Sequence, residues 1–251
     1  MSELEIFALI FAGLSAGFIN TLAGNGSLIT LTLLMEFFGL PPLVANGTNR
    51  VGIVFHSMVT SYSMSKHHAL PKIAKRHMLP IIFVGGIVGG LLSIYVSNEQ
   101  FRLVYRILLV VLFFTLIINP KRWLKPELFT LNFPQWAQVL ILFIVGLYGG
   151  FIQMGMGIFL LAVLVLIYKL PMMTANTIKL FSVLIYTPFV LVILIMNDLV
   201  DWKYGLIIAI GQLVGGWVTS RYIAQWRHAN ILAYILLVIM VSVALVKIIF
   251  F

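Results

Sequence analysis

The sequence predicts an all-α, polytopic membrane protein made of two inverted repeats of five segments each. Three observations predict it: the composition, an internal repeat, and the lengths of the apolar segments. Of the 251 residues, 62% are hydrophobic and only 9% are charged, whereas a soluble domain carries about 25% charged residues. The apolar runs are long and do not alternate with polar residues, unlike the ~10-residue strands of a membrane β-barrel. We therefore expect membrane-spanning helices.

The internal repeat has an offset that drifts from 133 residues (13 to 146) to 126 residues (90 to 216). Five short motifs recur in the same order: Gly13–Asn20 as Gly146–Gln153, Gly24–Gly26 as Gly155–Gly157, Leu40-Pro41 as Leu170-Pro171, Ala45-Asn46 as Ala175-Asn176, and Val88–Gly90 as Val214–Gly216. In an apolar chain, a duplicated half is typical of transporters whose binding site lies at the repeat interface.

Ten apolar segments follow, five in each half: 4–23, 27–39, 43–65, 77–97 and 100–118, then 135–153, 157–169, 172–196, 203–220 and 229–250. Residues 120–134 join the halves, so the chain forms one transmembrane domain over 1–251, with repeat 1 at 4–118 and repeat 2 at 135–250. An odd number of passes makes the second half enter from the opposite side, which predicts inverted topology.

The second and seventh segments are too short to span a membrane. Ser27–Phe38 and Gly157–Tyr168 each have 12 residues, about 18 Å of helix against a hydrocarbon core of about 30 Å. We expect each to form a re-entrant hairpin with the segment before it, turning at Gly24–Gly26 and at Gly155–Gly157. The two turns would then meet near the midplane, where non-helical backbone needs protein or water around it. Two tilted helices with glycine turns at the surface remain the alternative.

Loop charge predicts the orientation. With the first basic loop in the cytoplasm and alternating sides, ten cations lie inside and four outside. Those inside are Lys66, Lys72, Lys75, Arg76, Lys121, Arg122, Lys125, Lys169, Arg221 and Arg227; those outside are Arg102, Arg106, Lys203 and Lys247. This asymmetry places both termini outside the cytoplasm. It also accounts for the net charge of +9 without a nucleic-acid partner. The acidic start of the chain, with Glu3 and Glu5, lacks the basic region of a signal peptide.

Two cations lie inside apolar segments. Arg50 and Lys179 follow the repeated Ala-Asn by one helical turn, about 10–12 Å below opposite membrane faces if the halves are inverted. An ionisable residue at this depth indicates a functional site. All seven acids lie at segment ends or in loops, so no internal salt bridge is expected. Buried cations without protein counter-ions predict an anion site; snorkelling to the surface is the alternative.

Polar residues and glycines around these cations complete the predicted substrate site. Helices that begin after the glycine turns direct free N–H groups at the turns. The predicted substrate-binding residues are Asn20, Gly24, Asn25, Gly26, Ser27, Asn46, Thr48, Asn49, Arg50, Gln153, Gly155, Gly157, Asn176 and Lys179. Glycines can instead permit close packing, and buried Asn and Thr can instead join helices.

The remaining chemistry is sparse. The chain has no cysteine, and His67, His68 and His77 lack metal-ligand spacing, so we expect no metal, no cofactor and no catalytic residues. His56 lies deep in the third segment; it could bond a helix backbone or carry protons.

The glycine-rich end of the first segment, the Leu40-Pro41-Pro42 motif and the run Ala45-Asn46-Gly47-Thr48-Asn49-Arg50 resemble the TauE/SafE family of sulfite exporters. The resemblance covers nearly the whole chain. It implies a small protein of the bacterial inner membrane that moves sulfite, sulfonates or related sulfur anions. This chain has Gly24-Asn25-Gly26-Ser27 where the family commonly has a run of glycines.

The predicted function is secondary transport or export of a small anion, such as a sulfur oxyanion or an organosulfonate, by alternating access of the two halves. An anion channel would use the same residues and is the alternative. A membrane enzyme acting on a lipid phosphate is less favoured, since such chemistry needs an intramembrane base or nucleophile. The predicted partners are the anion and membrane lipid; the sequence does not indicate the oligomeric state.

Overall fold

The computed structural model describes residues 1–66, 70–118 and 132–223, with single positions at 231, 235, 238, 239 and 242. Throughout these described residues, all regular secondary structure is helical, which confirms the all-α prediction. Most of the connection 120–134 and most of the predicted tenth segment, 229–250, lie outside the described residues, as do His67 and His68.

The helices of the first half follow the predicted segments closely. They are α1 (Glu3–Leu22), α2 (Ser27–Thr32) continued by the π-helical turn η1 (Leu33–Phe37), α3 (Pro42–Ser65), η2 (Ala74–Met78) leading into α4 (Leu79–Ser93), and α5 (Asn98–Ile118). Those of the second half are α7 (Gln135–Phe151), α8 (Met156–Ala162) continued by η4 (Val163–Ile167), α9 (Met172–Ile195), and α10 (Trp202–Val218) continued by η5 (Thr219–Ile223).

Local signals set the helix starts. Ser2 and Glu5 form a capping box at the start of α1, which satisfies two backbone N–H groups reciprocally. Pro41 and Pro171 directly precede α3 and α9 in extended conformations, as expected because proline restrains φ and lacks an N–H. Asp201 caps α10 by accepting from two N–H groups of its first turn.

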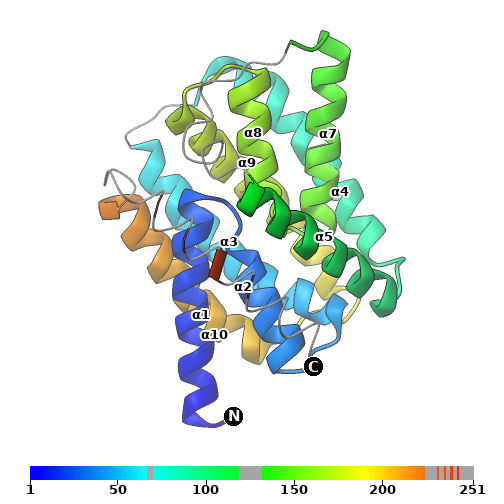
Figure 1. The fold of residues 1–251 in the computed structure, drawn as a ribbon, viewed down its shortest axis with the longest axis vertical. Coiled ribbons are helices and arrows are strands. Elements are labelled where there is room, and N and C mark those ends of the chain that lie inside the picture. The colour runs from blue at the N-terminus through cyan, green and yellow to red at the C-terminus, as the bar shows by residue number, and fades with distance from the viewer. Residues whose placement is uncertain are drawn as a thin grey trace.

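Helices from different halves pack together in pairs. α1 lies against α10, and α4 lies against α7, while α3 and α9 contact each other at the centre (Figure 1). Glycines bring these backbones close: a Cβ at Gly17 would lie 2.4 Å from Gln212 O, and one at Gly89 would lie 1.9 Å from Leu147 O. Small residues at such contacts are typical of helix packing in membranes, so the packing interpretation holds for these glycines.

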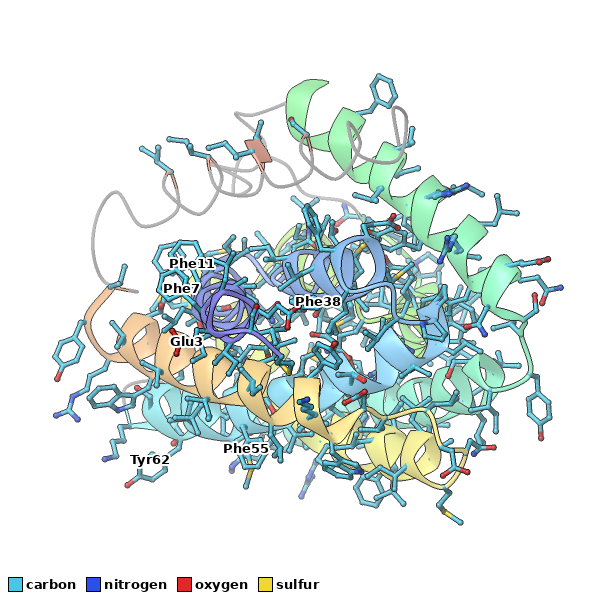
Figure 2. All side chains as sticks on the ribbon, turned by 90° about the horizontal axis from the view of Figure 1, so that it is seen from below. Glu3, Phe7, Phe11, Phe38, Phe55 and Tyr62 are labelled. Carbon is cyan, nitrogen blue, oxygen red and sulfur yellow. The ribbon has the colours of Figure 1, made fainter. Side chains whose placement is uncertain are left out.

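The outside of the molecule suits a lipid environment. Within the described part of the chain, four helical stretches are long and apolar enough to cross a membrane: Glu3–Leu22, Ala74–Ser93, Met172–Ile195 and Trp202–Ile223. Phe7, Phe11 and Phe55 are exposed and lie on the outer surface of their helices (Figure 2). A soluble protein rarely exposes so much contiguous apolar surface.

Three further apolar helices are shorter: Ser27–Phe37, Gln135–Phe151 and Met156–Ile167. In both halves a long helix ends, the chain turns at glycines, and a short helix follows. These two broken helices, α1–α2 and α7–α8, position the candidate site.

Candidate functional site

The two glycine turns touch each other. Gly157 N donates a hydrogen bond of 3.2 Å to Gly24 O, and a Cβ on Gly24 would lie 2.5 Å from Gly157 Cα. Gly24 and Gly155 have φ values of +77° and +76°, which glycine adopts without the steric cost that an L side chain meets. Glycine is therefore required here by conformation at Gly24 and by proximity at Gly157.

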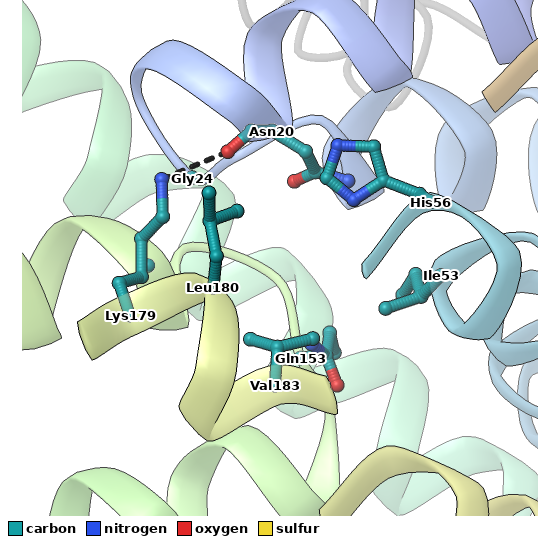
Figure 3. A pocket seen from close by; sticks show the side chains of 9 residues that line it. Asn20, Gly24, Ile53, His56, Gln153, Lys179, Leu180 and Val183 are labelled. Atoms are coloured by element: carbon teal, nitrogen blue, oxygen red, sulfur yellow. Dashed lines mark hydrogen bonds between the residues drawn. The ribbon is translucent and has the colours of Figure 1, made fainter. Parts of the chain in front are cut away.

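A small cavity lies beside this contact (Figure 3). Its walls come from both halves. The first half supplies Asn20 at the end of α1, Gly24 in the turn after it, and Ile53 and His56 from α3; the second half supplies Gln153 after α7, Gly157 at the start of α8, and Lys179, Leu180 and Val183 from α9. Its volume is about 20 Å³, and one ordered water needs about 10–15 Å³ on the same scale. This conformation therefore has room for about one water molecule.

Lys179 is buried, with 1% of its surface exposed, and it holds the end of α1. Its Nζ donates to Asn20 O at 2.9 Å (Figure 3) and to Thr21 O at 3.2 Å. Both carbonyls belong to the last turn of α1, where carbonyls lack intrahelical partners and carry partial negative charge. The ammonium group therefore caps a helix of the other half.

Arg50 does the same for the other broken helix and is completely buried. Its Nη2 donates to Gly149 O at 3.0 Å and to Gly150 O at 2.5 Å, both near the end of α7. Its Nη1 donates to Gln153 Oε1 at 2.6 Å. The third nitrogen of the guanidinium group, Nε, is buried and has no hydrogen-bond partner among the described residues.

Each cation caps a helix of the other half. Arg50 of α3 bonds the carbonyls near the end of α7, and Lys179 of α9 bonds the carbonyls at the end of α1. We call these two contacts the crossed caps; they occur at equivalent places in the repeat. The partners of both cations are neutral oxygens. Helix C-termini therefore offset part of the desolvation of both charges, a contribution that the sequence analysis did not foresee. A carbonyl oxygen carries only a partial negative charge, so a cation is attracted to it less strongly than to an anion.

His56 lies beside Lys179 in the same cavity. Its Nε2 is 3.0 Å from Thr21 Oγ1 and 3.2 Å from Gly17 O. Since Thr21 Oγ1 donates to the same Gly17 O at 2.8 Å, the tautomer with hydrogen on Nε2 satisfies these contacts. His56 thus bonds the backbone of α1, which is the first of the two roles considered from the sequence.

Five predicted residues line the cavity: Asn20, Gly24, Gln153, Gly157 and Lys179. Asn20 acts through its oxygens, because its Oδ1 accepts from Gly26 N at 2.7 Å while its backbone oxygen holds Lys179. Gln153 has φ of +64°, a conformation uncommon for residues other than glycine.

Other predicted residues lie around the turns without lining the cavity. Gly26 packs against the backbone of Ala16, Gly155 is the residue before α8, and Ser27 is buried in the first turn of α2. Asn25 is fully buried, and neither side-chain polar atom has a partner in the described structure. Such an orphan costs about 1–3 kcal/mol in a protein interior.

Three predicted polar residues join helices. Asn46 Nδ2 donates to Phe151 O, the last carbonyl of α7, at 3.0 Å. Thr48 Oγ1 accepts from the backbone N of the α10 cap at 2.9 Å, and Asn49 Oδ1 accepts from Thr30 Oγ1 at 2.5 Å. These three side chains therefore connect neighbouring helices, as buried Asn and Thr residues do in membrane proteins. Asn176 is buried, and its Oδ1 has no partner in the described structure.

Ile53, Leu180 and Val183 also line the cavity, although they were not predicted to. Ile53 lies three residues after Arg50, and Val183 lies four residues after Lys179. Residues at these spacings share a helix face, so helical periodicity could have found these two. Tyr186 was also missed: its hydroxyl donates to Gln153 Oε1 at 3.1 Å.

The sequence matches the model of one protein family. The family model described as sulfite exporter TauE/SafE matches residues 9–246. The chain belongs to the TauE/SafE family. The fold and the broken helices described above are therefore those of a TauE/SafE member.

Relatives of the TauE/SafE chain have similar lengths. It is 25% identical over 255 residues to a probable membrane transporter protein, ORF9, of Sinorhizobium sp, covering 98% of this chain and 94% of that protein. It is 26% identical over 230 residues to the probable membrane transporter protein YfcA of Escherichia coli K12, covering 89% and 82%. A probable membrane transporter protein of Haemophilus influenzae is 27% identical over 219 residues, covering 84% and 83%. No solved structure matches the chain.

TauE/SafE membership and the apolar helices identify an integral membrane protein of a transporter family. The relatives' names state membrane transport and no enzyme activity.

Proposed function

We propose that this protein is a secondary transporter that exports a small anion, with sulfite or a related sulfur oxyanion or organosulfonate as the substrate class. The observation that carries the proposal is the pair of buried cations, Arg50 and Lys179, whose hydrogen-bond partners among the described residues are neutral oxygens. Lys179 lines the cavity shared by both halves, and Arg50 bonds Gln153 in its wall. The family description names sulfite export, and this supports the sulfur-anion class.

An anion would compete with the helix ends for the cations. A full negative charge on an oxyanion attracts a buried ammonium or guanidinium group more strongly than the partial charge of a carbonyl oxygen does, because charges interact strongly in a low-dielectric interior. An oxyanion at Lys179 would therefore displace Asn20 O and Thr21 O and release the end of α1. The unpaired Nε of Arg50 offers a further donor. Binding of the anion would in this way free the end of a broken helix, which would have to move for the cavity to open.

In this conformation the cavity between the two halves would be closed to the substrate. A cavity of about 20 Å³ holds about one water, so a polyatomic anion requires it to widen. Opening from alternate sides, as the halves rock about a pseudo-two-fold axis, would provide this. The pairing of α1 with α10 and of α4 with α7 is what exchange of two equivalent halves would produce, and it supports inverted repeats. A closed centre also favours a transporter over an anion channel.

The proposed setting is the bacterial inner membrane, with both termini outside the cytoplasm and the glycine turns near the midplane. A membrane potential that is negative inside would drive an anion outward at about 2.3 kcal/mol per charge per 100 mV. Reporter fusions at Met1 test the orientation, and a cytoplasmic location of this end would contradict it.

The deciding experiment is flux in proteoliposomes with sulfite, sulfate, thiosulfate and taurine. Saturable uptake of one sulfur anion is expected for the wild type. Arg50→Ala and Lys179→Ala should each weaken apparent affinity about 10- to 100-fold, because a hydrogen bond to a charged group contributes about 1.5–3 kcal/mol. Arg50→Lys keeps the charge but loses the planar fork, so it should fall between.

The matched control is Lys203→Ala, which removes an exposed cation at the start of α10. All variants are compared at equal amounts of folded, reconstituted protein, since the two cations also cap helices. Unchanged affinity and rate in both Arg50→Ala and Lys179→Ala would show that these cations are structural and that the site lies elsewhere.

A further inference from the structure

A second cleft lies at the far end of α3, away from the central cavity. It has a volume of about 510 Å³ and lies between the last turns of α3 and the stretch that joins α10 to η5. Val59, Tyr62, Ser63, Lys66, Trp217, Arg221 and Tyr222 line it. Lys66 is ten residues beyond His56, about 15 Å along a helix. The Lys66–Arg221 cleft shares none of its lining residues with the cavity of the proposed substrate site.

The lining combines cations with aromatic rings. Lys66 Nζ lies 4.4 Å from the centre of the Tyr62 ring. The Arg221 guanidinium lies 5.7 Å from the Trp217 ring and 5.5 Å from the Tyr222 ring. Among the described residues that line the cleft there is no carboxylate. Cation–π contacts hold the two side chains in place and leave their positive charge unbalanced within this lining, so the cleft attracts an anion.

The aromatic rings face the surroundings of the protein. Tyr62 is 65% exposed and Tyr222 is 60% exposed, and Tyr62 lies at the edge of the molecule (Figure 2). Trp and Tyr at the ends of membrane helices gather at headgroup level, where an amphipathic ring is most stable. This placement fits the level of lipid phosphates, and three further cations, Lys72, Lys75 and Arg76, follow Lys66 in the sequence, the last two in η2.

We propose that the Lys66–Arg221 cleft binds the phosphate group of an anionic membrane lipid. Its volume lies within the range of about 300–1,000 Å³ usual for small-molecule sites, and basic pockets between membrane helices suit anionic headgroups. Lys66 and Arg221 contact the phosphate. The exposed rings pack against the glycerol and the first methylenes, which a free phosphate ion lacks. The occupant is therefore a lipid headgroup rather than a soluble anion.

The test is binding of dioleoyl phosphatidylglycerol to delipidated full-length protein in detergent, measured by native mass spectrometry against dioleoyl phosphatidylcholine. The wild type should prefer phosphatidylglycerol. Each cation near an anionic lipid surface contributes about a 5-fold factor, so Lys66→Gln with Arg221→Gln should weaken binding about 30-fold. Lys203→Gln is the matched control, since it removes an exposed cation 18 residues before Arg221, about 27 Å along the helix. It should leave binding unchanged.

A second measurement uses the wild type alone, so it decides the question even where the double variant fails to fold. Phosphatidylglycerol in nanodiscs should slow acylation of Lys66 relative to phosphatidylcholine, with Lys203 as the internal reference. Equal labelling of Lys66 in both lipids, or equal affinity of a folded double variant, would overturn the proposal. Displacement of the lipid by millimolar inorganic phosphate would also overturn it and would make the cleft a site for a soluble anion.

Discussion

Replacing Gly24 with alanine tests whether contact between the two turns is essential. Gly24 and Gly39 have φ values of +77° and +66°, so alanine at either position meets the same backbone penalty of about 1–2 kcal/mol. A Cβ at Gly39 meets nothing within 4 Å, whereas one at Gly24 lies 2.5 Å from Gly157 Cα. Overpacking of this kind costs about 1–3 kcal/mol more. Gly39→Ala is thus a matched control: the difference in stability between the two variants measures the steric clash of the added methyl group at Gly24.

The measurement is thermal unfolding of both purified variants in the same detergent. A difference of 1–3 kcal/mol corresponds to about 2–12 °C in a chain of this size, with Gly24→Ala the less stable variant. Transport should survive Gly39→Ala and be lost in Gly24→Ala, because the added methyl group separates the turns. Equal Tm values for the two variants would refute the reasoning and would show that the turns separate at no cost.

Three further outcomes follow from single contacts. Gly89→Ala should lower stability by at least 1–3 kcal/mol, since its Cβ would lie 1.9 Å from Leu147 O; wild-type Tm would contradict close packing of α4 and α7. Tyr186→Phe removes the hydroxyl that donates to Gln153 and should cost about 0.5–1.5 kcal/mol in unfolding free energy; no change would indicate that this bond contributes nothing. Asp201→Ala removes the cap of α10 and should cost about 0.5–2 kcal/mol by the same measurement, with Asp201→Asn close to wild type.

Helix positions could be predicted well from this sequence, because apolar runs of membrane length leave few alternatives. The glycine turns were also predictable: Gly24 and Gly155 recur at matched positions, and both adopt positive φ. The π-helical turns η1 and η4 were not predicted, since their residues are nearly all apolar and show no periodicity that an extra residue in the turn would shift. Whether ten segments span the membrane, and with which orientation, stays a prediction.

For Arg50 and Lys179, burial could be predicted from the sequence, but their hydrogen-bond partners could not. Their burial followed from their place in apolar segments, and the lack of a carboxylate among their described partners followed from the distribution of acids. Their partners did not follow, because the carbonyls at the end of α1 and of α7 carry no side-chain signature. A backbone group becomes an acceptor only where a helix stops, and the residue that reaches it is about 100 to 160 positions away.

The crossed caps make the halves mutually dependent. Expressed alone, residues 1–118 would present the carbonyls at the end of α1 without Lys179 and would leave Arg50 without the end of α7. Neither defect can be repaired within one half, and hydrocarbon supplies no substitute partners. Such an arrangement is what a dimer of single-repeat ancestors would have needed before fusion, each subunit completing the other. Two fragments separated within residues 119–134 should accordingly be unstable apart and assemble when produced together.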